Sequence, residues 1–191
     1  MSDTHSVIEA FFKGKKWSLG LMGKESRCYF GGPISDHVET KVNLKKAALH
    51  NLGTLNLPKF NVGFKFGFSL PLLYGICHEG CEIEYKKTAA SALEITQLEP
   101  KKAEAGYPYH NYPLMLPYYE LGIVKETEIE DEILNDALYN TEWEPDKNKL
   151  YAIVKQHPHI GHCLFEPGGG VEIIFEFNTE TGVVKAVNQC D

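Results

Sequence analysis

Residues 157–163 gather the side chains best suited to metal or nucleophilic chemistry. They read His157-Pro-His-Ile-Gly-His-Cys163, so three imidazoles and one thiol fall within seven positions. Neutral imidazole and thiolate are the usual ligands of zinc in proteins. If this segment is extended, alternation places His157, His159 and Cys163 on one face, whereas His162 points to the other.

The spacing of these ligands fits no standard zinc motif, such as paired CxxC or HExxH. Cys77-His78-Glu-Gly-Cys81 could add ligands if the fold brought it near. A thiol beside a histidine also has the residue types of a nucleophile and its base, but sequence neighbours on a strand face opposite sides. We therefore expect no bound metal and no cofactor. The alternative is a hydrolase or metal-dependent enzyme built on four residues: His157, His159, His162 and Cys163.

Residues 107–119 form an aromatic strap. Five tyrosines and three prolines fall within these thirteen positions. Proline fixes φ and lacks a backbone donor, so the segment should be stiff and extended. Tyrosine rings offer contact area at low entropic cost, so the strap either covers a sheet edge or forms a recognition surface. The candidate binding residues are Tyr107, Tyr109, His110, Tyr112, Tyr118 and Tyr119.

Acidic residues crowd the stretch from Glu126 to Asp136, which is either a docking face for a basic partner or the solvated side of a helix. The whole chain carries 26 acidic and 19 basic residues, a formal charge of -7. Neutralising phosphates needs a positive face, and the lysines here are scattered as doublets, so we expect no nucleic-acid partner. A basic partner protein suits this charge better.

Length and composition predict a single globular domain over residues 1–191. No apolar run reaches about 18 residues, and the first residues lack the basic-then-apolar order of a signal peptide. We therefore expect a cytoplasmic location and no membrane partner. Five cysteines are an odd number in a chain of 191 residues, which favours reduced thiols over a disulfide framework.

Alternation of apolar and polar residues predicts a sheet built from hairpins. Residues 62–68 place four apolar side chains opposite Gly63 and Gly67, which indicates a core strand whose bare face could admit a small ligand. Residues 81–97 and 171–187 read as antiparallel hairpins, and residues 149–154 as a further strand.

One helix is predicted after Thr127, because Thr127 and Glu130 form a capping-box pattern ahead of an apolar stripe that ends at Leu138. Residues 6–13 and 44–52 show weaker helical patterns. No βαβ alternation and no repeat is visible, so the predicted fold class is α+β, with a mainly antiparallel sheet and a few short helices.

The patterns GxSxG, GxGxxG and the P-loop are missing from the sequence. The sequence therefore favours a non-enzymatic protein-binding domain, such as an inhibitor or immunity-type protein that acts on a basic partner. The aromatic strap and the acidic stretch support this interpretation. The enzyme at residues 157–163 and a small-ligand binder at Gly63 and Gly67 are the alternatives.

Overall fold

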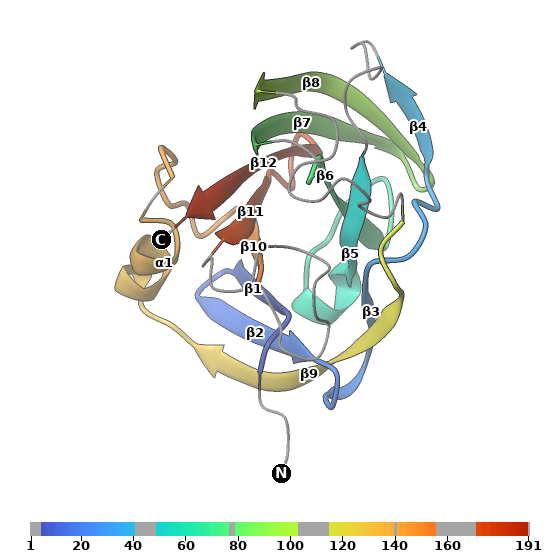
Figure 1. The fold of residues 1–191 in the computed structure, drawn as a ribbon. Coiled ribbons are helices and arrows are strands. Elements are labelled where there is room, and N and C mark those ends of the chain that lie inside the picture. Colours follow the sequence, from blue (N-terminus) through green and yellow to red (C-terminus); the bar gives the residue numbers. More distant parts are fainter. Residues whose placement is uncertain are drawn as a thin grey trace.

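Twelve strands join in one sheet (Figure 1). The computed structural model describes residues 5–40, 49–76, 79–102, 115–139, 141–155 and 171–190. The strands are β1 (Ile8–Phe12), β2 (Lys15–Gly20), β3 (Lys24–Phe30), β4 (His37–Thr40), β5 (His50–Asn56), β6 (Ser69–Tyr74), β7 (Glu79–Ala89), β8 (Ala92–Lys102), β9 (Tyr119–Glu128), β10 (Leu150–Val154), β11 (Val171–Phe177) and β12 (Val183–Cys190). Within these residues, the helices are α1 (Asp131–Ala137) and the short 3₁₀ turn η2 (Leu57–Phe60).

The order of strands across the sheet joins distant parts of the sequence. It runs β4-β8-β7-β12-β11-β10-β1-β2-β9-β3-β5-β6. The pairs are antiparallel, except that β4 runs parallel to β8. The first hairpin, β1 and β2, therefore lies in the middle of the sheet, between β10 on one side and β9 on the other.

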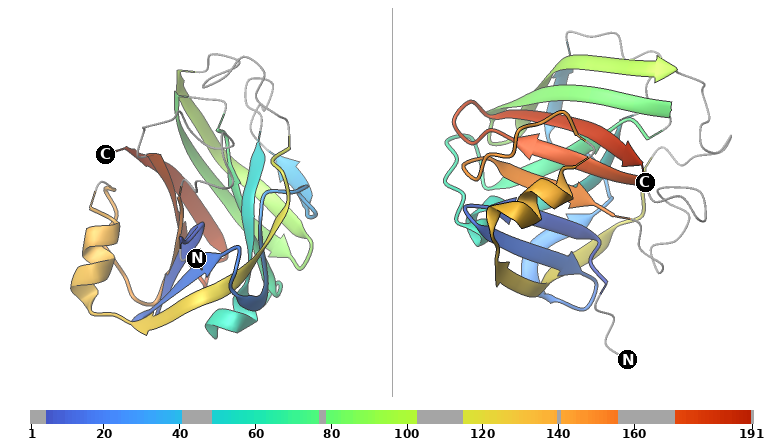
Figure 2. Two further views of the ribbon diagram at one scale, coloured as in Figure 1. Left: turned by 60° about the horizontal axis from the view of Figure 1, so that its bottom comes forward. Right: turned by 90° about the vertical axis from the view of Figure 1, so that its left-hand side faces the viewer.

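The sheet curls until β6, the last strand in this order, lies against β7. The Tyr85 hydroxyl donates to the carbonyl of Pro71 at 2.6 Å and accepts from the N–H of Leu73 at 3.2 Å. Farther along, the N–H of Cys81 donates to the Tyr74 hydroxyl at 2.9 Å. The strands consequently form two walls around a shared interior (Figure 2).

Side-chain alternation fills that interior. In β7 the inward residues Cys81, Ile83 and Tyr85 are buried, while Glu82 and Glu84 between them face outward and are half-buried. Neighbouring strands repeat this pattern, and their inward residues form one core that reaches from Trp17 in β2 to Phe175 and Phe177 in β11. Burial of this apolar surface drives the curling of the sheet.

A second, smaller core lies on the outer face of the sheet, beneath α1 (Figures 1 and 2). Leu134 and Leu138 of the α1 region pack there on Phe11 of β1, and on Tyr151 and Ile153 of β10. Both faces of β10 are therefore covered, which explains why all five of its residues are buried.

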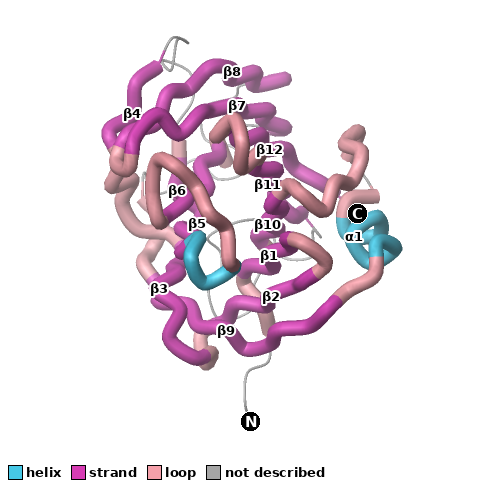
Figure 3. The backbone as a smooth tube through the Cα atoms, turned by 180° about the vertical axis from the view of Figure 1, so that it is seen from behind, coloured by secondary structure: helices cyan, strands magenta, loops and turns pink. Residues whose placement is uncertain are grey.

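The predicted α+β class is wrong, because strands dominate the described chain (Figure 3). Its helical residues are those of α1 and of the 3₁₀ turn η2. Residues 6–13, predicted as a helix, contain β1 (Ile8–Phe12) instead. Its apolar residues face the interior on one side and α1 on the other, so the pattern lacks the alternation of a half-exposed strand. Residues 44–48 lie outside the described residues, and residues 50–52 belong to β5. No helix in the described residues is long and apolar enough to cross a bilayer.

The core strand predicted at residues 62–68 is also wrong. These residues form the connection from η2 to β6. Phe64 is half-buried and packs edge-on against Phe177 at 5.0 Å, whereas the Phe68 side chain is 79% exposed. Phe64 also packs edge-on against Phe66 at 5.7 Å, so the alternating aromatic residues do not form one face of a strand.

The hairpins predicted at residues 81–97 and 171–187 are confirmed as β7–β8 and β11–β12, and residues 150–154 form β10 as expected. The predicted helix exists but is shorter than its pattern. Thr127 belongs to β9, and the N-cap is Glu130, whose side chain makes no capping hydrogen bond.

Candidate protein-binding surfaces

The acidic segment, defined as residues 126–146, runs from the end of β9 through α1 towards β10. It contains nine acidic residues and no lysine, arginine or histidine. The other 17 acidic residues of the chain are outnumbered by its 19 basic residues. The net negative charge of the protein therefore resides in this one segment. Its acids are Glu126, Glu128, Glu130, Asp131, Glu132, Asp136, Glu142, Glu144 and Asp146.

The sheet holds the acidic segment in place. Leu134 and Leu138 anchor it in the outer core, and the half-buried Trp143 packs against the same cluster. At its far end the N–H of Asp146 donates to the Tyr151 hydroxyl at 3.0 Å. Burial raises the pKa of Tyr151 to about 12, so its hydroxyl stays protonated and can donate to Glu176 at 3.4 Å. The segment is thus fixed at α1, at Trp143 and at Asp146.

The face of the acidic segment that points away from the sheet combines apolar and acidic side chains. Ile133 is 45% exposed and Tyr139 is 60% exposed. Six acids of the segment are exposed as well: Glu130, Asp131, Glu132, Asp136, Glu142 and Glu144. Apolar anchors ringed by charged residues are the usual anatomy of a protein–protein interface.

One ion pair involves the acidic segment in the described part of the chain. The Lys15 ammonium lies 3.0 Å from the Glu126 carboxylate, and the hydrogen bond it donates lowers the pKa of Glu126. Both side chains are well exposed, and pairs of this kind contribute little to stability. The remaining carboxylates described in the segment have no cation within 4.0 Å, so their charge is available to a partner.

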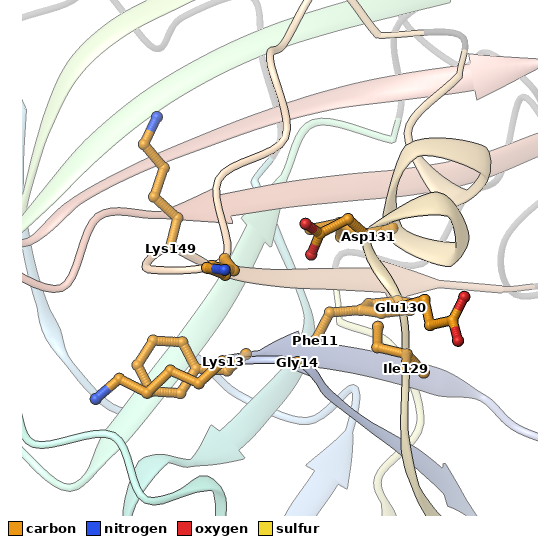
Figure 4. A pocket seen from close by; sticks show the side chains of 10 residues that line it. Phe11, Lys13, Gly14, Ile129, Glu130, Asp131 and Lys149 are labelled. Carbon is orange, nitrogen blue, oxygen red and sulfur yellow. The ribbon is translucent and has the colours of Figure 1, made fainter.

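A narrow crevice separates the start of α1 from the β1–β2 turn (Figure 4). The ammonium groups of Lys13 and Lys149 point away from α1, and Glu130 points outward on the opposite side. Lys149 instead pairs with Glu176 at 3.1 Å. The space in the crevice, about 10 Å³, is close to the minimum for one water molecule. It therefore cannot take a ligand.

The described end of the aromatic strap borders the Tyr118 hollow, a concavity of about 490 Å³ beside β3 and β9. The Tyr118 ring is 53% exposed and lies 5.2 Å from the Tyr29 ring. Burial, with the nearby Glu120 carboxylate, raises the pKa of Tyr118, so the hydroxyl is neutral at pH 7. Arg27 and Glu120 also line the hollow.

The other candidate residues of the strap differ from Tyr118. Tyr119 opens β9, is half-buried and packs against the main core near Phe30, so its ring serves the fold. The remaining predicted binding residues lie outside the described residues: Tyr107, Tyr109, His110 and Tyr112. The described end of the strap, residues 115–119, and the acidic segment lie at opposite ends of β9, a ten-residue strand of roughly 33 Å (Figure 1).

The proposed metal and catalytic residues at 157–163 lie outside the described residues, as do Cys77 and His78. Among the residues that the structure describes, no three His, Cys, Asp or Glu side chains are grouped to hold a metal ion. Cys28 and Cys81 are buried free thiols. Burial raises the pKa of Cys28, and that of Cys81 to about 11, which makes both poor nucleophiles at neutral pH.

Gly63 and Gly67 do not share a strand face, because both lie in the connection from η2 to β6. Gly63 is exposed, and a Cβ atom at Gly67 would lie 2.8 Å from Cε of Lys87. The small-ligand site was predicted on the bare face of a strand, and residues 62–68 form no such strand. A different set, Arg27, Lys59 and Phe68, was missed by sequence reasoning, because these residues come together only when β3 passes η2 and the start of β6.

Comparison with known proteins adds no relative to this picture, since no protein-family model, no curated protein and no solved structure matches the chain. The two surfaces are therefore interpreted from their own chemistry. One is the acidic segment with its apolar residues on α1. The other is the concave region around Tyr118 and Arg27 at the opposite end of β9.

Proposed function

We propose that this chain is a non-enzymatic protein-binding domain that captures a basic partner protein through the acidic segment, in the manner of an inhibitor or immunity protein. One observation carries the proposal: residues 126–146 hold the whole net negative charge of the chain and present it beside the exposed Ile133 and Tyr139. We place the protein in the cytoplasm, and we expect no nucleic-acid or membrane partner.

Charge and apolar area have separate tasks in this proposal. A cluster of unpaired carboxylates steers an oppositely charged protein into contact and raises the association rate. Once the partner is docked, Ile133 and Tyr139 supply apolar area that its surface can desolvate, with the acids forming the polar rim. Steering should weaken with added salt, whereas the apolar contribution should persist.

The anchoring of α1 on the sheet supports tight capture. Leu134 and Leu138 hold the helix in the outer core before any partner arrives. A surface already held in its binding conformation loses less conformational entropy on association than a flexible one does. This separates the proposed site from a disordered acidic tail, whose ordering would oppose binding.

Affinity capture from cell extract, with mass spectrometry of bound proteins, tests the proposal. The wild-type chain should retain a basic protein. The triple variant Glu130→Gln, Glu132→Gln, Asp136→Asn should lose it, with an affinity for the purified partner at least tenfold lower. A charge-matched control, Glu39→Gln, Glu99→Gln, Glu180→Gln, changes the net charge equally at exposed acids outside the segment and should bind like the wild type.

Ile133→Ala combined with Tyr139→Ala tests the apolar part of the surface. This double variant keeps every charge and should weaken the same partner by about 2 kcal/mol or more, the size of a hot-spot loss. The proposal fails if the α1 charge variant and the charge-matched control hold the partner equally well, or if the retained partner is acidic.

A further inference from the structure

Arg27 is the single arginine of the chain, since the other 18 basic residues are lysines. It lies in β3 where the pairing with β9 shifts register between Glu25 and Cys28, at a bulge. Its backbone adopts the left-handed conformation, with φ +57°, which is uncommon outside glycine. Bulges often re-aim a side chain towards a site, and here the Arg27 side chain is exposed.

A second hollow, the Phe68 hollow, shares Arg27 with the Tyr118 hollow but not Tyr118 itself. It is an open concavity of about 560 Å³, and its lining is Arg27, Asn56, Pro58, Lys59 and Phe68. This size falls within the usual range of about 300–1,000 Å³ for small-molecule sites. The lining contains two cations, one amide and one aromatic ring, and no carboxylate.

The two cations of the Phe68 hollow are not neutralised by the described part of the protein. Neither the Arg27 guanidinium nor the Lys59 ammonium has a carboxylate within 4.0 Å there. A guanidinium offers a planar fork of donors that fits two oxygens of a phosphate at once, and an ammonium adds a point charge.

Phe68 supplies the apolar half of the hollow. Its ring is 79% exposed, an uncommon position for a phenyl group. The backbone around it is held, because the Phe68 carbonyl accepts from the N–H of Leu57 at 2.9 Å and Ser69 begins β6. Asn56 is fixed as well, by the bond from its amide to the carbonyl of Ser26 at 3.0 Å. An exposed flat ring beside cations is a platform on which another flat ring can stack.

From this arrangement we infer that the Phe68 hollow binds a small organic phosphate that carries a flat aromatic ring, of about the size of a mononucleotide. The phosphate lies on Arg27 and Lys59, and the ring stacks on Phe68. This site is separate from the acidic segment in position and in the sign of its charge, so it stands or falls independently of the proposed capture of a basic protein.

Isothermal titration with adenosine monophosphate, adenosine and inorganic phosphate tests the inference. We expect the nucleotide to bind at least tenfold more tightly than either fragment, because only the nucleotide engages both halves of the hollow. Phe68→Ala should weaken the nucleotide at least fivefold and leave inorganic phosphate unchanged. Arg27→Lys keeps the charge but removes the fork, and should weaken the nucleotide at least threefold.

Lys185→Gln is the matched control, because it removes one exposed cation outside the hollow and should leave binding unchanged. Thermal unfolding of each variant checks that the fold is intact, which is expected since Arg27, Phe68 and Lys185 are exposed. The inference is overturned if the nucleotide does not bind at millimolar concentration. It is equally overturned if folded Phe68→Ala and Arg27→Lys bind it like the wild type.

Discussion

At the scale of single residues, one ion pair in the described part of the chain is almost completely buried. The Lys87 ammonium lies 3.0 Å from the Asp36 carboxylate, and their side chains are 0% and 6% exposed. Lys87 continues the inward row of Cys81, Ile83 and Tyr85 along β7. Asp36 comes from the link that precedes β4. Two charges removed from water are tolerated only while they face each other.

Asp36→Ala should therefore destabilise the protein by about 3–5 kcal/mol, because it leaves the Lys87 charge buried without a partner. The double variant Asp36→Leu, Lys87→Met removes both charges and should be clearly more stable than Asp36→Ala. Chemical denaturation measures both. Lys15→Ala, which breaks the exposed pair with Glu126, is the control and should lose less than about 1 kcal/mol. Equal losses for Asp36→Ala and Lys15→Ala would contradict the assignment.

The second prediction at this scale concerns Glu9 and the loss of its stabilising effect at acid pH. Burial raises its pKa, but hydrogen bonds from Lys155 and Lys16 outweigh burial and leave the pKa below 4.5. A carboxyl group with a depressed pKa stabilises the fold above its unfolded value, and that stabilisation is lost as pH falls through the folded value. Glu9→Gln should lose about 1.5–3 kcal/mol at pH 7. Denaturation at several pH values measures the difference in unfolding free energy between the wild type and Glu9→Gln, which should disappear below about pH 4.5. A difference that stays constant from pH 7 to pH 3 would contradict the prediction.

Sequence patterns predict only some of these residue positions. Alternation across Cys81, Ile83 and Tyr85 correctly predicts which face of β7 is buried. The same alternation places Lys87 inside, yet its partner Asp36 is 51 positions away and no local pattern links them. The position of Arg27 cannot be predicted from the sequence for a related reason. A bulge depends on the register of two strands that are distant in sequence.

At the scale of elements, α1 covers an apolar part of the outer face of the sheet. It covers Phe11, Tyr151 and Ile153, apolar residues that would otherwise leave the outer face of β1 and β10 exposed. Local hairpins such as β11–β12 are predictable from sequence, since the turn lies between their strands. The neighbours of β1 are not, because β10 lies about 140 positions along the chain and pairing over such distances leaves no periodic signal.

Two substitutions in the α1 region test which side faces the sheet. Leu138 is buried in the outer core, so Leu138→Ala should lose about 2–5 kcal/mol of unfolding free energy. Ile133 lies on the outward side, and Ile133→Ala should change stability by less than about 0.5 kcal/mol. Thermal or urea unfolding provides both values. The orientation of α1 is refuted if Ile133→Ala proves the more damaging change.

At the scale of the whole molecule, negative and positive charges are concentrated on different parts of the surface. The acidic segment and the cationic Phe68 hollow lie at different places on the curled sheet. One end of β9 belongs to the acidic segment, and β9 also pairs with β3, the strand that carries Arg27. Net charge was readable from composition, but its concentration beside two exposed apolar side chains of the α1 region required the fold. The two proposals therefore assign separate surfaces, the acidic segment to a basic protein and the Phe68 hollow to an anionic ligand.

The claim that the acidic segment is the surface for a basic partner can be measured directly by NMR titration with a seven-lysine peptide at low salt. We expect the largest amide shifts within residues 126–146, reversal by about 0.5 M salt, which screens exposed charges, and loss of the shifts in the triple variant Glu130→Gln, Glu132→Gln, Asp136→Asn. Shifts spread evenly over the surface, or centred on other acids such as Glu82 and Glu84 and unchanged in that variant, would contradict the claim.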